Sequence, residues 1–272
     1  MTKEIEGQYI YIDEVKYYKI TNVDEMEPFL MSIISSTNHW MFIGSNGGLT
    51  AGRVNPEQAL FPYYTEDKVI QSAHDTGSVM MVRVKKEGKT YLWRPFTKFY
   101  EGWFNIESNM YKSMFGDHLI FEEINHTLQL SVAYSWTFSE EFGFVRQAEI
   151  KNLSDADTSV ELLDGLQNLM PAAVGTALQT ERSSLVNAYK QNEYLEGSTL
   201  GMYSLSSRII DRAEPSEALL ATSVWQAGLE NGTILTCSRQ MKSFIQDTPL
   251  HPEPLTKAVP GAYLSAYSLH LK

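Results

Sequence analysis

The sequence predicts an all-β protein, a large antiparallel β-sandwich with few short helices. Three observations support this prediction. Apolar and polar residues alternate over strand-length segments, most regularly between residues 119 and 164. Short polar turns separate these segments. Aromatic residues make up 12% of the chain, and such residues suit the half-buried faces of sheets.

The N-terminal region predicts a β-hairpin followed by a short helix. The strands are expected at Gln8 to Asp13 and Val15 to Ile20, with a short polar turn between them. The segment 22–35 is expected to begin as a helix, because Asp24 is a suitable N-cap residue. Pro28 limits how far this helix extends.

A second hairpin and a series of strands are expected after it. Val79 to Lys85 and Thr90 to Arg94 flank a charged, glycine-containing turn. One expected strand places five apolar residues on a single face: Leu128, Leu130, Val132, Tyr134 and Trp136. The other expected strands are Leu119 to Ile124, Phe144 to Lys151, Ser159 to Asp164, Gly201 to Ile209, Ala218 to Trp225, Thr233 to Cys237 and Ala262 to Leu271. A short helix is expected within Thr180 to Leu195.

Composition and charge narrow the classes of protein. The chain has 272 residues and no linker-like segment, so we expect a single domain over residues 1–272. The net charge of −11 disfavours binding to nucleic acid or to anionic membranes. The first residues lack the apolar segment of a signal peptide, and no apolar run is long enough to span a bilayer, which favours a cytoplasmic protein.

Three segments contain the candidate ligand-binding residues. The segment from Asn38 to Arg53 combines glycines with polar side chains, although a tight hairpin explains the same pattern. Paired tyrosines follow in Ala59 to Lys68, where packing at the rim of the sandwich is the alternative. Arg94 follows Trp93 and could stack on it or pair with a carboxylate, and core packing is again the alternative. The candidates are Ser45, Asn46, Arg53, Tyr63, Tyr64, Trp93 and Arg94.

No motif indicates a complete catalytic or metal site. The carboxylates of Asp211 to Glu217 surround one arginine, and a solvated turn with local ion pairs explains them. The six histidines lack the spacing of a zinc site. Cys237 is the only cysteine and lies in an apolar segment, so we expect a core thiol. We therefore expect no catalytic residue, metal or cofactor in this chain.

The order of several motifs resembles a known family. A glycine-rich hairpin (Ser45 to Gly48) precedes Arg53, and Trp93 to Pro95 follows. Next come Ile150 to Ser154 and Val160 to Asp164. Over residues 38–171 this order resembles the N-terminal domain of cellobiose phosphorylase-like enzymes and their inverting glycoside hydrolase relatives.

This resemblance implies a fold, a partner and a role. The family's N-terminal domain is a β-supersandwich of the galactose mutarotase-like kind. A helical linker and an (α/α)₆ barrel with the catalytic acid follow it. The sandwich supports the barrel, often joins a homodimer and lends loops to the sugar site. The sequence reaches Lys272 without such a linker or barrel, so we expect the N-terminal part of a glycoside phosphorylase or hydrolase, and carry over no catalytic residue.

Two other functions stay open at this point. A stand-alone carbohydrate-binding module would use exposed aromatic residues as a stacking platform. Its candidates are Tyr63, Tyr64, Trp93 and Trp103. An aldose epimerase would need a general base and a general acid that face one sugar. Its candidate pairs are His118 with Glu122 or Glu123, and His74 with Asp75.

Overall fold

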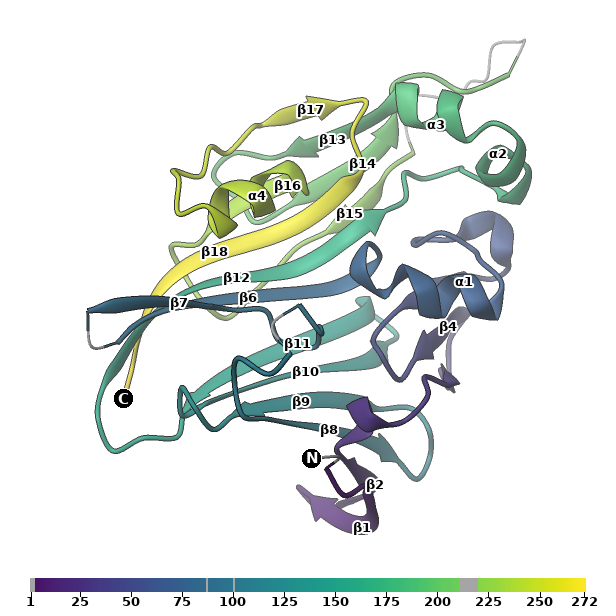
Figure 1. Cartoon of the computed structure of the whole chain (residues 1–272). Coiled ribbons are helices and arrows are strands. Elements are labelled where there is room, and N and C mark those ends of the chain that lie inside the picture. Colours follow the sequence, from purple (N-terminus) through teal and green to yellow (C-terminus); the bar gives the residue numbers. More distant parts are fainter. Residues whose placement is uncertain (1–2, 87, 100, 211–219) are drawn as a thin grey trace.

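The computed structural model describes residues 3–86, 88–99, 101–210 and 220–272 (Figure 1). In these parts of the chain β-strands dominate, and each α-helix has only six or seven residues. The all-β class predicted from the sequence is therefore confirmed. The strands pair in antiparallel fashion into four sheets of six, five, four and three strands. This arrangement corrects the expectation of a single two-layer sandwich.

Two larger sheets form the centre of the molecule. The six-stranded sheet has the order β1-β2-β8-β9-β10-β11, and the five-stranded sheet has the order β16-β18-β12-β6-β7. The strands of the first are β1 (Glu6–Ile12), β2 (Val15–Thr21), β8 (Ile106–Ser113), β9 (Leu119–Asn125), β10 (Leu130–Ser139) and β11 (Gly143–Asn152). The strands of the second are β16 (Thr233–Cys237), β18 (Gly261–Leu271), β12 (Thr158–Leu169), β6 (Gly77–Lys86) and β7 (Lys89–Trp93).

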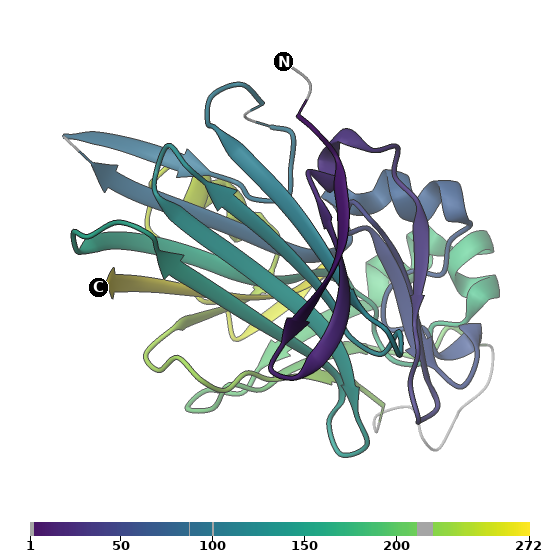
Figure 2. The same cartoon turned by 90° about the horizontal axis from the view of Figure 1, so that it is seen from below.

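Two smaller sheets and the helices surround this centre. The four-stranded sheet contains β15 (Thr222–Val224), β14 (Gly201–Leu205), β13 (Lys190–Tyr194) and β17 (Leu255–Lys257). The three-stranded sheet contains β3 (Leu30–Ile33), β4 (His39–Gly44) and β5 (Leu49–Arg53). The α-helices are α1 (Glu66–Gln71), α2 (Thr176–Glu181), α3 (Ser183–Tyr189) and α4 (Arg239–Ile245). Seen from below, α1, α2 and α3 lie together on one side of the strands (Figure 2).

Both hairpins predicted from the sequence are present. β1 and β2 pair from Glu6 to Thr21 around the turn residues Asp13 and Glu14. These residues have φ angles of 45° and 68°, as a type I′ turn requires. β6 and β7 form the second hairpin. The helix expected at 22–35 is only a 3₁₀ turn, Val23–Glu25, and Asn22 rather than Asp24 occupies its N-cap position, without a side-chain capping hydrogen bond.

The alternating pattern of the middle strands places their apolar residues in the interior. The two larger sheets share one cluster, in which Val82 and Val84 of β6 pack with Leu130 and Val132 of β10. A second cluster draws buried residues from all four sheets. It includes Ile43, Phe121, Trp136, Leu169, Tyr203 and Tyr263. The smaller sheets therefore cover the parts of the central core that the two larger sheets leave open.

A largely buried ion pair, with side chains 9% and 17% exposed, joins the two larger sheets. Arg146 on β11 donates two hydrogen bonds of 2.8 Å to the carboxylate of Asp164 on β12. Its Nε also donates to Ser78 Oγ on β6 at 2.9 Å, and its guanidinium lies 5.0 Å from the ring of Tyr134 on β10. Such a bidentate arrangement fixes both distance and orientation. The pair therefore sets how the facing sheets align.

The ion pair leads to a prediction about stability. Asp164→Asn leaves the buried guanidinium without a full countercharge, so we expect the free energy of unfolding in urea to fall by about 3 kcal/mol. The control is Asp157→Asn, because Asp157 is 58% exposed and pairs with His270 at 3.0 Å. We expect that variant to lose less than about 1 kcal/mol. Equal losses in the two variants would contradict a special role for Asp164.

Candidate functional site

An aromatic surface lies on the outer face of the three-stranded sheet. Along β4, Met41 and Ile43 point into the core, whereas Phe42 is 40% exposed and Trp40 is half-buried. This alternation follows from the two-residue repeat of a strand. Gly52 lies opposite Trp40 on β5, and a side chain at that position would collide with the indole. The glycine therefore makes room for Trp40.

Tyr63 completes this surface from the loop after β5. Its ring meets the edge of Trp40 at a centroid distance of 5.7 Å and an interplanar angle of 89°. The ring of Phe42 lies 6.1 Å from that of Trp40. Below, "the aromatic surface" means Trp40, Phe42 and Tyr63. Two rings at a right angle form a corner with two flat apolar walls.

Contacts with α2 hold Tyr63 in place. Its backbone N–H donates to Gln179 Oε1 at 2.9 Å. Nearby, the backbone N–H of Thr176 donates to Glu57 Oε2 at 3.1 Å. Pro62 is buried directly before Tyr63 and restricts the backbone there. The loop is thus fixed before any ligand arrives, which lowers the entropy cost of binding.

The other candidate residues do not join the aromatic surface. Ser45 is buried, and its Oγ accepts a hydrogen bond of 3.2 Å from Phe29 N. Arg53 lies opposite His39, the residue before Trp40. Because neighbouring residues of a strand point to opposite faces, Arg53 and Trp40 lie on different faces of the sheet. Burial and the nearby Arg53 lower the pKa of His39. Tyr64 is 41% exposed. Partial burial, and to a smaller extent the negative charge of Asp75, raise the pKa of its hydroxyl group.

Asn46 and Arg94 line a small polar cavity between the two larger sheets. The cavity also contacts Arg146 and Gln167, and its volume is about 20 Å³. That space accommodates one water molecule. Asn46 Nδ2 donates to the carbonyl of Ile70 at 2.8 Å, which ties the glycine-rich turn to α1. Both candidates are half-buried and line this cavity.

Trp93 belongs to the core. It is 1% exposed, and its indole N–H donates to Glu123 Oε1 at 2.8 Å. The backbone N–H of Phe96 donates to Glu123 Oε2 at 2.6 Å. Burial raises the pKa of Glu123 to about 7, although these two hydrogen bonds act in the opposite direction. This carboxyl group joins β9 to the segment after β7.

The acid–base pairs considered for an epimerase lie in different surroundings. His118 Nδ1 lies 2.6 Å from the Tyr17 hydroxyl, and burial lowers the pKa of this histidine. Glu122 lies in β9, four residues after His118, so an extended backbone sets their Cα atoms about 13 Å apart. Glu123 faces the core. His74 and Asp75 are both exposed, and the ring of His74 contacts Phe99 at 5.7 Å.

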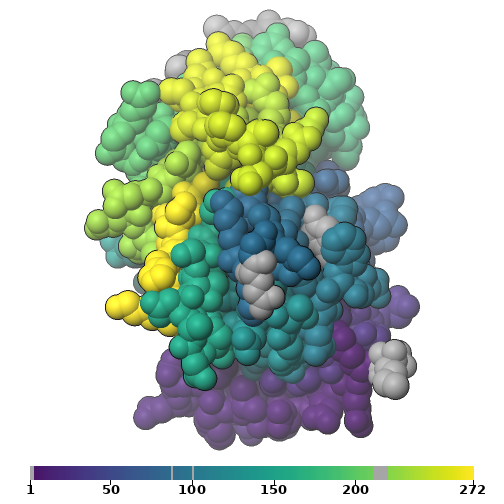
Figure 3. Space-filling view, turned by 60° about the vertical axis from the view of Figure 1, so that its left-hand side comes forward, coloured from purple at the N-terminus to yellow at the C-terminus, as the bar shows by residue number. Residues whose placement is uncertain are grey.

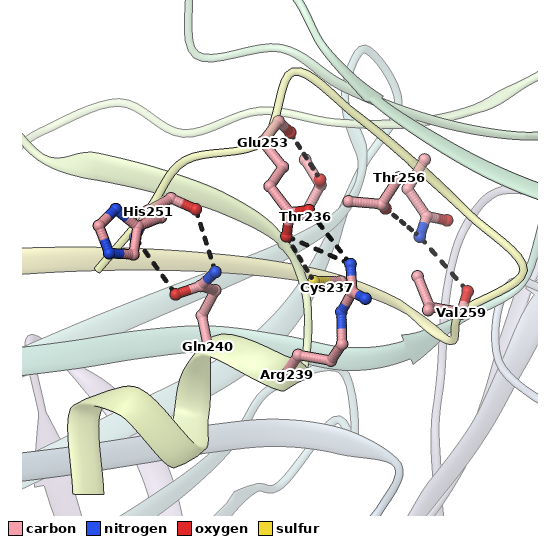
Figure 4. A network of polar contacts seen from close by, with 9 residues as sticks. Thr236, Cys237, Arg239, Gln240, His251, Glu253, Thr256 and Val259 are labelled. Carbon is pink, nitrogen blue, oxygen red and sulfur yellow. Dashed lines mark hydrogen bonds and ion pairs between the residues drawn. The ribbon is translucent and has the colours of Figure 1, made fainter. Parts of the chain in front are cut away.

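Cys237 lies in a polar network at the start of α4 (Figure 4). Its Sγ donates to Glu253 Oε2 at 3.8 Å, and Arg239 Nη2 donates to Glu253 Oε1 at 3.2 Å. Gln240 exchanges hydrogen bonds with the backbone of His251. The network ties α4 to the loop before β17. The thiol is buried, as expected from the sequence.

Neither a metal-binding cluster nor a membrane-spanning helix occurs among the described residues. In residues 3–86, 88–99, 101–210 and 220–272, no group of three His, Cys, Asp or Glu side chains is placed to hold a metal ion. None of the helices in these ranges has the length and apolar character needed to cross a bilayer. The carboxylate-rich segment Asp211 to Glu217 lies outside the described residues.

No family model matches the chain. No curated protein matches it either.

The buried Glu123 leads to a prediction about pH. Its folded-state pKa of about 7 lies above the ordinary value of 4.5, so its neutral form stabilises the fold below pH 4.5. This contribution, about 3 kcal/mol, is lost as the pH rises through 7. Urea unfolding at a series of pH values should show the loss.

The matched variants separate Glu123 from other carboxylates. Glu123→Gln stays neutral, so we expect this part of the pH dependence to disappear. Glu140→Gln changes an exposed residue and should keep it. Identical pH profiles for the wild type and Glu123→Gln would contradict the assignment.

Proposed function

We propose that this chain is a non-catalytic all-β domain of a carbohydrate-active protein, of the cellobiose phosphorylase-like and galactose mutarotase-like kind that its motifs resemble. In this role the domain binds carbohydrate and supports a separate helical-barrel catalytic domain. The aromatic surface of Trp40, Phe42 and Tyr63 is the observation that carries the proposal.

The chemistry of the aromatic surface suits a neutral sugar. One face of a pyranose ring carries mainly C–H groups, which pack on the flat wall of an aromatic ring. Tyr63 is 40% exposed and carries a hydroxyl group, and Ser32 pairs with Phe42 and shares its face of the sheet. These hydroxyl groups offer partners to sugar hydroxyls. A net charge of −11 repels anions but has little effect on an uncharged oligosaccharide.

An apolar groove supports the scaffold role. It lies between the six-stranded and three-stranded sheets, and has a volume of about 420 Å³. Tyr18, Met31, Ile34 and Met114 line it, together with Phe115, which is 80% exposed. Exposed apolar surfaces of this kind mark sites of association with other protein surfaces. In this proposal the helical catalytic domain packs against the groove.

Calorimetry with a panel of neutral oligosaccharides tests the carbohydrate proposal. We expect saturable binding of at least one β-linked or α-linked glucan by the wild type. Trp40→Ala and Tyr63→Ala should each weaken it at least about tenfold, a loss of about 1.4 kcal/mol. The aromatic residues supply most of the contact area, so their truncation removes the apolar walls.

A matched control uses an exposed tryptophan elsewhere. Trp103 is 76% exposed and lies outside the aromatic surface, so Trp103→Ala should bind as the wild type does. Circular dichroism confirms that each variant is folded. The proposal fails if no sugar binds at millimolar concentration, or if Trp103→Ala weakens binding as much as Trp40→Ala.

A further inference from the structure

We propose that β1 pairs with β1 of a second copy of this chain, so that two six-stranded sheets join into one continuous sheet. β1 is the edge strand of its sheet, and only β2 pairs with it in the described structure. Figure 1 shows β1 at the bottom of the molecule, and Figure 3 shows the N-terminal hairpin (purple) forming the base of the surface. Both faces of this strand are largely exposed.

The hairpin register identifies the backbone groups on the open edge. Ile12 and Val15 close a type I′ turn, so they form a hydrogen-bonded pair. Such pairs alternate with non-hydrogen-bonded pairs along an antiparallel ladder. The N–H and C=O groups of Gly7, Tyr9 and Tyr11 therefore point away from β2. An exposed row of this kind is a template for another strand.

β1 lacks the features that usually protect an edge strand. Charged residues, prolines and bulges prevent unwanted pairing in most sheets. The other edge of the same sheet, β11, carries Arg146, Glu149 and Lys151. β1 has one charged residue, Glu6, at its start, and then Gly-Gln-Tyr-Ile-Tyr-Ile. Tyr9 and Tyr11 are 57% and 71% exposed, which leaves apolar surface beside the open backbone.

The strand is complementary to itself. An antiparallel pair centred on Tyr9 places Tyr9 opposite Tyr9 of the second copy and Gly7 opposite Tyr11. All three residues have their free backbone groups on this edge, so the pairing forms about six backbone hydrogen bonds. The Tyr18 side chain covers Gly7, and the incoming Tyr11 would therefore meet an aromatic ring. Aromatic cross-strand pairs stabilise such a ladder.

This self-complementarity favours a second copy over an unrelated segment. On the opposite face of the sheet, the same register sets Gln8 against Ile10 and Glu6 against Ile12. No two like charges within β1 therefore face each other. The tyrosines stay on one face together with Tyr18, which contacts Tyr9 at 5.2 Å. A two-fold symmetric dimer follows from these positions.

Sedimentation velocity of the full chain tests this proposal from about 1 μM to about 500 μM. We expect a concentration-dependent shift from monomer to dimer. Tyr9→Lys places two ammonium groups next to each other on the two-fold axis, so association should weaken at least tenfold. Tyr9→Glu should do the same with two carboxylates. An equimolar mixture of the two variants should restore the dimer, because opposite charges then meet.

Tyr189→Lys is the matched control, because Tyr189 is exposed at the end of α3. It should dimerise like the wild type. A chain that stays monomeric throughout overturns the proposal, as does a dimer that persists in Tyr9→Lys. A mixture that stays monomeric although both variants are folded overturns the register centred on Tyr9. Carbohydrate binding does not enter these measurements, so this proposal and the proposed function fail independently.

Discussion

The alignment of the two larger sheets depends on the ion pair between Arg146 and Asp164. These residues lie on β11 and β12, which are consecutive along the chain but belong to different sheets. The chain therefore leaves one sheet after residue 152 and enters the other at residue 158. The bidentate contact holds β11 and β12, the strands before and after this change of sheet, against each other. Ser78 on β6 and the Tyr134 ring hold the guanidinium from two further strands.

A second polar contact acts between the same layers without a countercharge. Glu123 is buried and receives hydrogen bonds from Trp93 and from the backbone of Phe96. The two contacts differ physically, because Asp164 pairs with a cation whereas Glu123 is stabilised as a neutral group up to about pH 7. The polar cavity next to Arg146 has room for about one water molecule. The two contacts thus act as a polar framework that holds the two larger sheets together.

The packing of the core also determines which side chains and backbone groups lie on the outer surfaces. Strand alternation that sends Met41 and Ile43 inward leaves Trp40 and Phe42 outside. The apolar groove lined by Phe115 opens between the six-stranded and the three-stranded sheets. β1 keeps one side of its backbone unpaired. Each proposed interaction uses a surface that the core packing leaves uncovered.

The sequence alone determined the all-β class, because the two-residue alternation and the polar turns act locally. It located both predicted hairpins and the buried face from Leu128 to Trp136. It also identified Tyr63 as a surface residue. Only the tertiary structure decided that the strands divide among four sheets, since strand pairing depends on long-range contacts. The same contacts place Trp93 in the core against Glu123, set Arg53 on the opposite face from Trp40, and bring Trp40 next to Tyr63. A strand pattern shows which residues share a face, but what covers that face is decided by distant parts of the chain.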